Sequence, residues 1–150
     1  MFLLYFLLAL TWMSVLDPGR DHVELAYIDA IAVERSHGAF GERSVLETLA
    51  LVVAIQYRES RFRSDAVGDH GQSFCSMQIH SSSGGEKRLL GDPEACVSLG
   101  LSLLASSSRL DPAHPVAAYA RGSRWRSGEA QKISDDRVQL ARSLLARTLP

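Results

Sequence analysis

The chain has 150 residues, of which 46% are apolar, and this length and composition predict one domain with a hydrophobic core. Its 16 basic and 17 acidic residues nearly cancel, which argues against nucleic acid or an acidic polymer as a partner. The histidines and cysteines show no spacing typical of a metal site, so we expect no metal and no cofactor. We also expect the protein to be a monomer.

Residues 1–16 form an apolar segment that differs from the rest of the sequence. At about 15 residues, the stretch from Phe2 to Leu16 is short for a bilayer span and typical of the apolar part of a signal peptide. We therefore expect a signal peptide at 1–16 and export to the periplasm, the cell envelope or the medium. No basic residue precedes the stretch and no clear cleavage site follows it, so a membrane anchor is an alternative. The two remaining alternatives are a buried N-terminal helix and a wrongly assigned start codon.

The segment after this stretch predicts two helices. Apolar residues recur at near-helical spacing over 23–34, and two glycines in 37–42 end the first helix. Ser44 and Glu47 then fit a capping box, in which the two side chains satisfy free amides at the start of a helix. The second helix, 45–58, contains the run LALVVAI, and a helix that is apolar on nearly every side is buried in the middle of a domain.

The rest of the chain predicts one irregular region and three further helices. Glycines, aspartates and serines in 61–80, continued by 81–85, indicate a loop or a small irregular hairpin. Apolar spacing predicts helices over 93–107, 116–120 and 133–147, with a glycine-containing loop at 122–128. The predicted fold class is therefore mainly α with a small irregular β or loop region, in a domain that spans 20–150.

The two cysteines, Cys75 and Cys96, are an even number in a chain that we expect to be exported, which favours a disulfide between them. Such a bond would close a loop of about 20 residues and stabilise the fold by roughly 3 kcal/mol on the chain-entropy model. Two reduced, buried thiols are the alternative.

One glutamate is placed for acid/base chemistry. Cleavage of a glycosidic bond needs a carboxyl group that still holds a proton near neutral pH, and an apolar environment favours the protonated form. Of the eight glutamates, Glu59 fits best, because it ends the very apolar helix at the point where polar residues return. An ion pair with Arg58, Arg61 or Arg63 is the alternative for Glu59.

The sequence around Glu59 resembles a known family. The stretch 54–79, AIQYRESRFRSDAVGDHGQSFCSMQI, is similar to the active-site segment of soluble lytic transglycosylases and goose-type lysozymes, which have E-S, a glycine-containing loop and then G-L-M-Q-I or a variant. A second block, A-Y-A-R-G at 118–122, is similar to the family's A-Y-N-A-G. The resemblance covers about residues 22–148, and it implies a lysozyme-like α+β domain that cleaves the glycan strands of peptidoglycan.

The resemblance also implies roles for individual residues. Glu59 would be the general acid and then the base, with Ser60 beside it, while Met77, Gln78 and Tyr119 would line the glycan cleft. Packing in the core is the alternative for Met77 and Tyr119.

Three departures from the family pattern bear on activity. Ala120 stands where the family has Asn, so an amide that could bind substrate or loop backbone is lost. Cys75 and Ser76 replace Gly-Leu before Met-Gln, which is consistent with a local disulfide. The Tyr at the start of the family's final helix is missing from the run SDDRVQLA at 134–141.

The reaction type depends on a second carboxylate. An inverting hydrolase needs one to activate water, whereas a lytic transglycosylase uses the muramic acid 6-hydroxyl and forms a 1,6-anhydro product. Asp69 in the piece G-D-H-G-Q-S-F is the candidate, and a second acidic position of goose-type lysozymes is His80 here. The alternative for Asp69 is a turn residue that bonds its own loop. We therefore predict a lytic transglycosylase, with a muramidase as one alternative and a non-catalytic glycan-binding envelope or secretion accessory protein as another.

Overall fold

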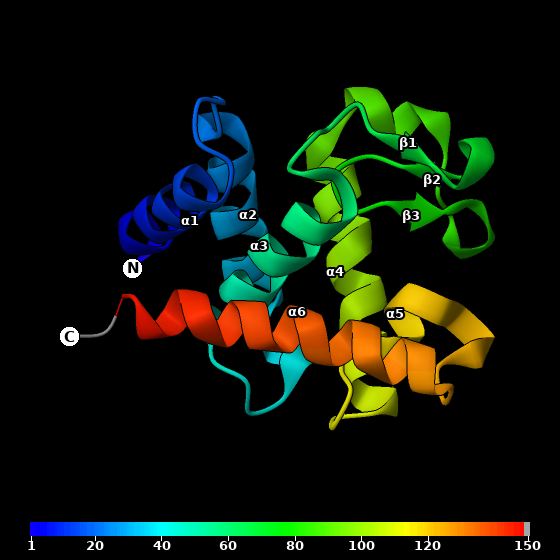
Figure 1. Ribbon diagram of the computed structural model, residues 1–150. Coiled ribbons are helices and arrows are strands. Elements are labelled where there is room, and N and C mark those ends of the chain that lie inside the picture. Colours follow the sequence, from blue (N-terminus) through cyan, green and yellow to red (C-terminus); the bar gives the residue numbers. More distant parts are fainter. Residues whose placement is uncertain (149–150) are drawn as a thin grey trace.

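The computed structural model describes residues 1–148 and is mainly helical with a small antiparallel sheet, which confirms the predicted fold class (Figure 1). Within these residues the α-helices are α1 (Phe2–Leu16), α2 (Val23–Ser36), α3 (Val45–Ser60), α4 (Pro93–Leu110), α5 (Ala117–Arg121) and α6 (Gly128–Ala146). The strands are β1 (Val67–Gly68), β2 (Ser73–Phe74) and β3 (Ile79–His80). Figure 1 shows α3 in the middle of the helices, α6 running beneath it, and the sheet on the side away from α1.

Helix α3 is the buried centre of the domain. The predicted capping box is present, because the Ser44 hydroxyl accepts from the Glu47 amide at 3.2 Å and the Glu47 carboxylate accepts from the Ser44 amide at 2.7 Å. Every residue from Leu49 to Ile55 is at most 1% exposed. The helix ends at Ser60, after which Arg61 takes a left-handed conformation with φ 52°. Glu59 therefore lies in the last turn of a fixed, fully packed helix.

Helix α1 packs into the same core. Its residues Tyr5, Ala9, Trp12 and Met13 are buried against α2 and α3. Residues 1–16 were predicted to lie outside the domain, whereas in the structure they form part of its packing. None of the helices within residues 1–148 is long and apolar enough to cross a membrane. Removal of this segment from the mature protein stays a prediction.

The irregular segment predicted at 61–85 contains the sheet. Strands β1, β2 and β3 pair in that order, both pairs antiparallel, with Val67 opposite Phe74 and Phe74 opposite Ile79. Each strand has two residues, because short 3₁₀ turns and left-handed residues interrupt the chain between them. The sheet thus serves as a compact wall beside the end of α3.

The last two long helices begin at side-chain caps that apolar spacing does not detect. Asp92 accepts from the Ala95 amide at 2.9 Å at the start of α4. Ser127 accepts from the Ala130 amide at 3.1 Å at the start of α6. The predicted start of the final helix at residue 133 is too late, because the residues before Ile133 are mostly polar and Ala130, which is buried in the first turn, is too small to mark an apolar face.

The predicted disulfide is present. Cys75, which follows β2, is bonded to Cys96 in the second turn of α4, with 6.3 Å between their Cα atoms. The alternative of two reduced thiols is therefore wrong for this structure. The bond ties the sheet region to α4.

Candidate active site

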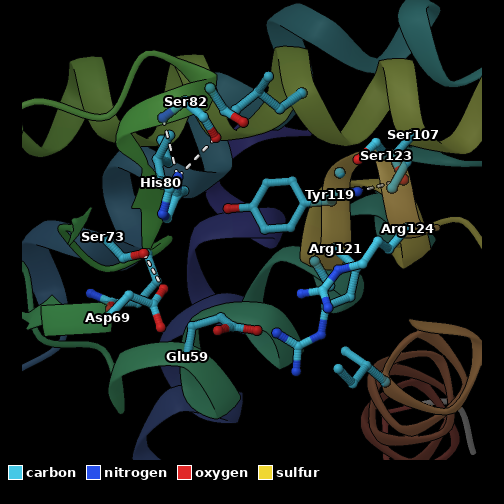
Figure 2. Close-up of a pocket in the computed structure, with 18 of the residues that line it drawn as sticks. Glu59, Asp69, Ser73, His80, Ser82, Ser107, Tyr119, Arg121, Ser123 and Arg124 are labelled. Carbon is cyan, nitrogen blue, oxygen red and sulfur yellow. Dashed lines mark hydrogen bonds between the residues drawn. The ribbon is translucent and has the colours of Figure 1, made fainter. Parts of the chain in front are cut away.

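A cleft of about 900 Å³ lies between the sheet on one side and α5 and α6 on the other (Figure 2). Glu59 lies at its floor, with Asp69 and His80 on the sheet side and Tyr119 and Arg121 on the α5 side. A cleft of this size accepts several groups of a polymer such as a sugar chain. The two sequence blocks that carry the family resemblance thus meet in one cavity.

Glu59 forms an ion pair, but not with the arginines named from the sequence. Its Oε1 accepts from the Arg137 guanidinium at 3.0 Å, and the Glu59 side chain is 24% exposed. Arg58 instead binds Asp136 at 3.0 Å, and Arg61 lies over the ring of Tyr57. The ion-pair hypothesis was therefore right about the interaction and wrong about the partner, which comes from α6.

Arg137 joins α6 to the end of α3. Its side chain is 16% exposed, and besides Glu59 it binds Asp136 at 2.9 Å, which in turn binds Arg58 at 3.0 Å. The result is a chain of four alternating charges across the packed helices. Arg137 was not among the predicted site residues, although the sequence contains a signal for it. It lies four residues after Ile133 and four before Ala141, on the apolar face of its helix.

Tyr119 is held from both ends. Its hydroxyl donates to the Met77 carbonyl at 2.6 Å, and its backbone amide donates to the Ser107 hydroxyl at 3.0 Å. Burial raises the pKa of the Tyr119 hydroxyl far above its ordinary value, and the Glu59 carboxylate raises it further. The phenol therefore stays protonated and remains a hydrogen-bond donor beside Glu59.

We expect Tyr119→Phe to lower the free energy of unfolding by about 1 kcal/mol, because the Met77 carbonyl loses its hydroxyl donor. Denaturant unfolding followed by circular dichroism measures this change. The matched control is Tyr27→Phe, since Tyr27 is 48% exposed on α2. Equal effects of the two substitutions would contradict a structural role for the Tyr119 hydroxyl.

Asp69 also faces the cleft. It lies in the 3₁₀ turn Asp69–Gly71 with a left-handed φ of 50°, and one of its carboxylate oxygens accepts from the Ser73 hydroxyl. Figure 2 shows Asp69 and Glu59 directed toward the same cavity. The structure thus brings the two carboxylates together, while the bond to Ser73 gives Asp69 the local loop contact expected of a turn residue.

Ser60 and Gln78 shape the cleft through the backbone. The Ser60 hydroxyl lies within bonding distance of the Gln56 carbonyl at 3.1 Å and the Ser76 carbonyl at 2.9 Å, which ties α3 to the segment after β2. The Gln78 side chain lines the cleft and donates to the carbonyls of Ala66 and Cys75. Its amide group is therefore already committed to holding the loop.

Met77 occupies a different environment from Gln78. Its side chain is fully buried, and its Cε, Cγ and Cβ pack so closely against Gly100 of α4 that a β-carbon there would lie 2.7 Å from the Cε. The side chain is not among the described residues that line the cleft. Its position is that of a core residue, and its carbonyl is the part that touches the site.

Two further arginines line the cleft from α5 and the 3₁₀ turn Gly122–Arg124. Arg121 binds Glu129 at 2.6 Å, and the Arg124 side chain extends toward the cavity (Figure 2). Charged residues in a loop are typical of a solvated face, so the sequence alone does not indicate that these two arginines line the same cleft as Glu59. We call Arg121, Arg124 and Arg137 the arginine wall.

The described residues contain no group of three or more histidine, cysteine or acidic side chains that could hold a metal ion. Comparison of the chain with protein-family models, with curated proteins and with solved structures gave no match.

Proposed function

We propose that the protein is a peptidoglycan lytic transglycosylase that cleaves the β-1,4 bond between N-acetylmuramic acid and N-acetylglucosamine, with Glu59 as its acid/base. The observation that carries the proposal is that Glu59, Gln78 and Tyr119, which come from the two resembling sequence blocks, line one cleft. Tyr119 keeps its proton and donates a hydrogen bond to the Met77 carbonyl, which holds the ring in place beside the reacting carboxyl group.

The reaction needs one carboxyl group. Glu59 first gives its proton to the glycosidic oxygen, and the bond from that oxygen to C1 of muramic acid breaks as positive charge develops on the ring. The 6-hydroxyl of the same sugar then attacks C1 and returns its proton to Glu59. The products are a glycan with a free 4-hydroxyl and a 1,6-anhydromuramic end, and the enzyme is regenerated.

The ion pair with Arg137 imposes a condition on this mechanism. A guanidinium within hydrogen-bond distance stabilises a carboxylate more than a carboxylic acid. Proton donation by Glu59 therefore requires that the 3.0 Å contact with Arg137 be weakened when the glycan enters. Arg137 still has Asp136 as a second partner, so it can lose Glu59 without becoming an unpaired buried charge.

Muramidase hydrolysis is the second candidate function, and the position of Asp69 in the cleft favours it. In that mechanism Asp69 activates a water on the opposite face of the sugar from Glu59. The bond from Ser73 and the left-handed turn give Asp69 a structural task that is sufficient to explain its presence, so we prefer the transglycosylase. Both functions place the protein outside the cytosol, an environment in which the Cys75–Cys96 bond is stable.

Digestion of purified peptidoglycan, with products separated and weighed by liquid chromatography and mass spectrometry, tests the proposal. We expect anhydromuropeptides from the unmodified chain and a rate about 10²–10⁴-fold lower from Glu59→Gln. Asp69→Asn is the matched control and should keep the anhydro product. Products with only reducing ends would make the enzyme a muramidase. If the unmodified chain cleaves peptidoglycan no faster than Glu59→Gln does, the result would favour a non-catalytic glycan-binding protein.

A further inference from the structure

The arginine wall makes the lining of the cleft more positive than the chain as a whole. Among the described residues that line the cleft, the charged side chains are the arginine wall on one side and two carboxylates, Glu59 and Asp69. The lining therefore carries one more positive than negative charge. Glu129 and Asp136, outside the lining, pair with Arg121 and Arg137, so within residues 1–148 Arg124 is the arginine of the wall that no ion pair involves. An excess of positive charge in a concave site attracts anionic ligands.

The arginine wall also has hydrogen-bond donors to spare. Arg121 uses one guanidinium nitrogen on Glu129, and Arg137 uses two, on Glu59 and Asp136. The Nε atoms of Arg121 and Arg137 are buried and have no partner within residues 1–148, and no ion pair in this range involves Arg124. Planar guanidinium groups with free N–H donors match the geometry of carboxylates, which accept two parallel hydrogen bonds.

The position of the arginine wall is specific to this cleft. Arg121 stands within the block A-Y-A-R-G, where the resembling family has Ala, and Arg137 stands in the final helix in the run that lacks the family's Tyr. Arg126, by contrast, lies two residues after Arg124, rests on the ring of Trp125 at 4.5 Å and does not line the cleft. Arg124 therefore lines the cleft, whereas Arg126, two residues further along the same loop, lies on the outer surface.

We propose that the arginine wall binds carboxylate groups carried by the glycan, so that the enzyme selects anionic peptidoglycan over neutral or amidated glycans. The inference rests on the proposed function, because it assigns the ligand chemistry of the same cleft. The carboxylates come either from the stem peptides or from the lactyl groups of strands without peptides. All three arginines line one cavity with Glu59, so a carboxylate bound by the arginine wall competes with Glu59 for the guanidinium of Arg137. Binding of the preferred substrate thereby loosens the ion pair that opposes proton donation.

Titration calorimetry on the Glu59→Gln variant, in which turnover is slowed about 10²–10⁴-fold, tests this inference. The four probes are glycan strands with stem peptides, strands stripped to the lactyl carboxylate, the peptide-bearing strands with all carboxylates amidated, and neutral chitohexaose. We expect the Kd of at least one carboxylate-bearing probe to be about tenfold lower than the Kd values of the amidated strands and of chitohexaose. A tenfold difference is what one charge-assisted contact, absent from the neutral probes, contributes. A preference for peptide-bearing strands identifies the stem peptide as the source, and a preference for stripped strands identifies the lactyl group.

The arginine substitutions locate the effect. In the same background, Arg124→Gln should abolish most of the tenfold preference, while the matched control Arg126→Gln should keep it. Equal Kd values for all probes, no binding of any probe, or equal effects of the two substitutions would overturn the inference. Failure of the proposed function has a different signature, in which carboxylate-bearing strands bind preferentially but the unmodified chain releases no product from them.

Discussion

Replacing Asp29 by Asn is expected to stabilise the protein at pH 7 and to have little effect at pH 4. Asp29 lies on α2, is fully buried and accepts one hydrogen bond at 2.9 Å from the Gln56 amide nitrogen. The second carboxyl oxygen of Asp29 and the Oε1 of Gln56 have no partner within residues 1–148. Burial raises the pKa of Asp29 from 3.8 to about 8, and the bond from Gln56 offsets only part of this effect.

The direction of the pH dependence follows from proton binding. Below pH 3.8 the folded and unfolded states both hold the Asp29 proton, and above that pH the unfolded chain releases it while the folded protein keeps it up to about pH 8. The contribution of Asp29 to stability is therefore present in full at low pH and is lost as the pH rises toward the folded value. The loss amounts to about 1.4 kcal/mol per pH unit at most.

Asparagine removes this dependence because it has no titrating proton. Its side-chain amide can also donate to Gln56 Oε1, which has no partner within the described residues of the unmodified protein. Thermal unfolding at pH 4 and pH 7 measures the effect, and Asp65→Asn is the control, since the Asp65 side chain is 78% exposed. A gain in stability of equal size at both pH values would contradict a buried, protonated Asp29.

The parts of the fold that local sequence determines were predictable. The capping box at Ser44, the buried helix after it and the position of Glu59 at its end follow from residues within a few positions of one another. The role of α1 did not follow, because a nearly continuous apolar run of about 15 residues is typical both of a signal peptide and of a helix packed in a core. Packing against α2 and α3 depends on partners that the run itself does not specify.

The partners of the buried polar groups were not predictable for the same reason. Arg137 contacts Glu59 from 78 residues away, and Asp29 contacts Gln56 from 27 residues away. Arg137 and Asp29 each interrupt the apolar face of a helix, which indicates that a partner exists but does not identify it. The cleft therefore had the predicted glutamate, glutamine and tyrosine, while its electrostatic character, set by the arginine wall, came only from the three-dimensional arrangement.

Loss of the Cys75–Cys96 bond is expected to cost about 3 kcal/mol of stability and to disorder one wall of the cleft. The disulfide spans 21 residues in sequence, and without it the unfolded chain gains the freedom that the closed loop removes. Its effect on the site is local. Cys75 has a left-handed φ of 67°, its amide donates to the Ala66 carbonyl at 2.9 Å, and its carbonyl accepts from the Gln78 side chain.

The Cys75–Cys96 bond fixes the same backbone segment that two residues of the cleft contact. Ser60 donates to the Ser76 carbonyl and Tyr119 donates to the Met77 carbonyl, so both contacts depend on the backbone directly after Cys75. Reduction with dithiothreitol should lower the denaturant midpoint of the unmodified chain to that of the double variant Cys75→Ser and Cys96→Ser, which the reductant should leave unchanged. Peptidoglycan turnover should fall in the reduced chain at temperatures where circular dichroism still shows it folded, because the cleft wall loosens before the helices unfold. An unchanged denaturant midpoint after reduction would show that packing around Cys96 holds this wall of the cleft without the disulfide. Full turnover by the reduced chain up to its unfolding temperature would show that the catalytic geometry does not depend on the disulfide.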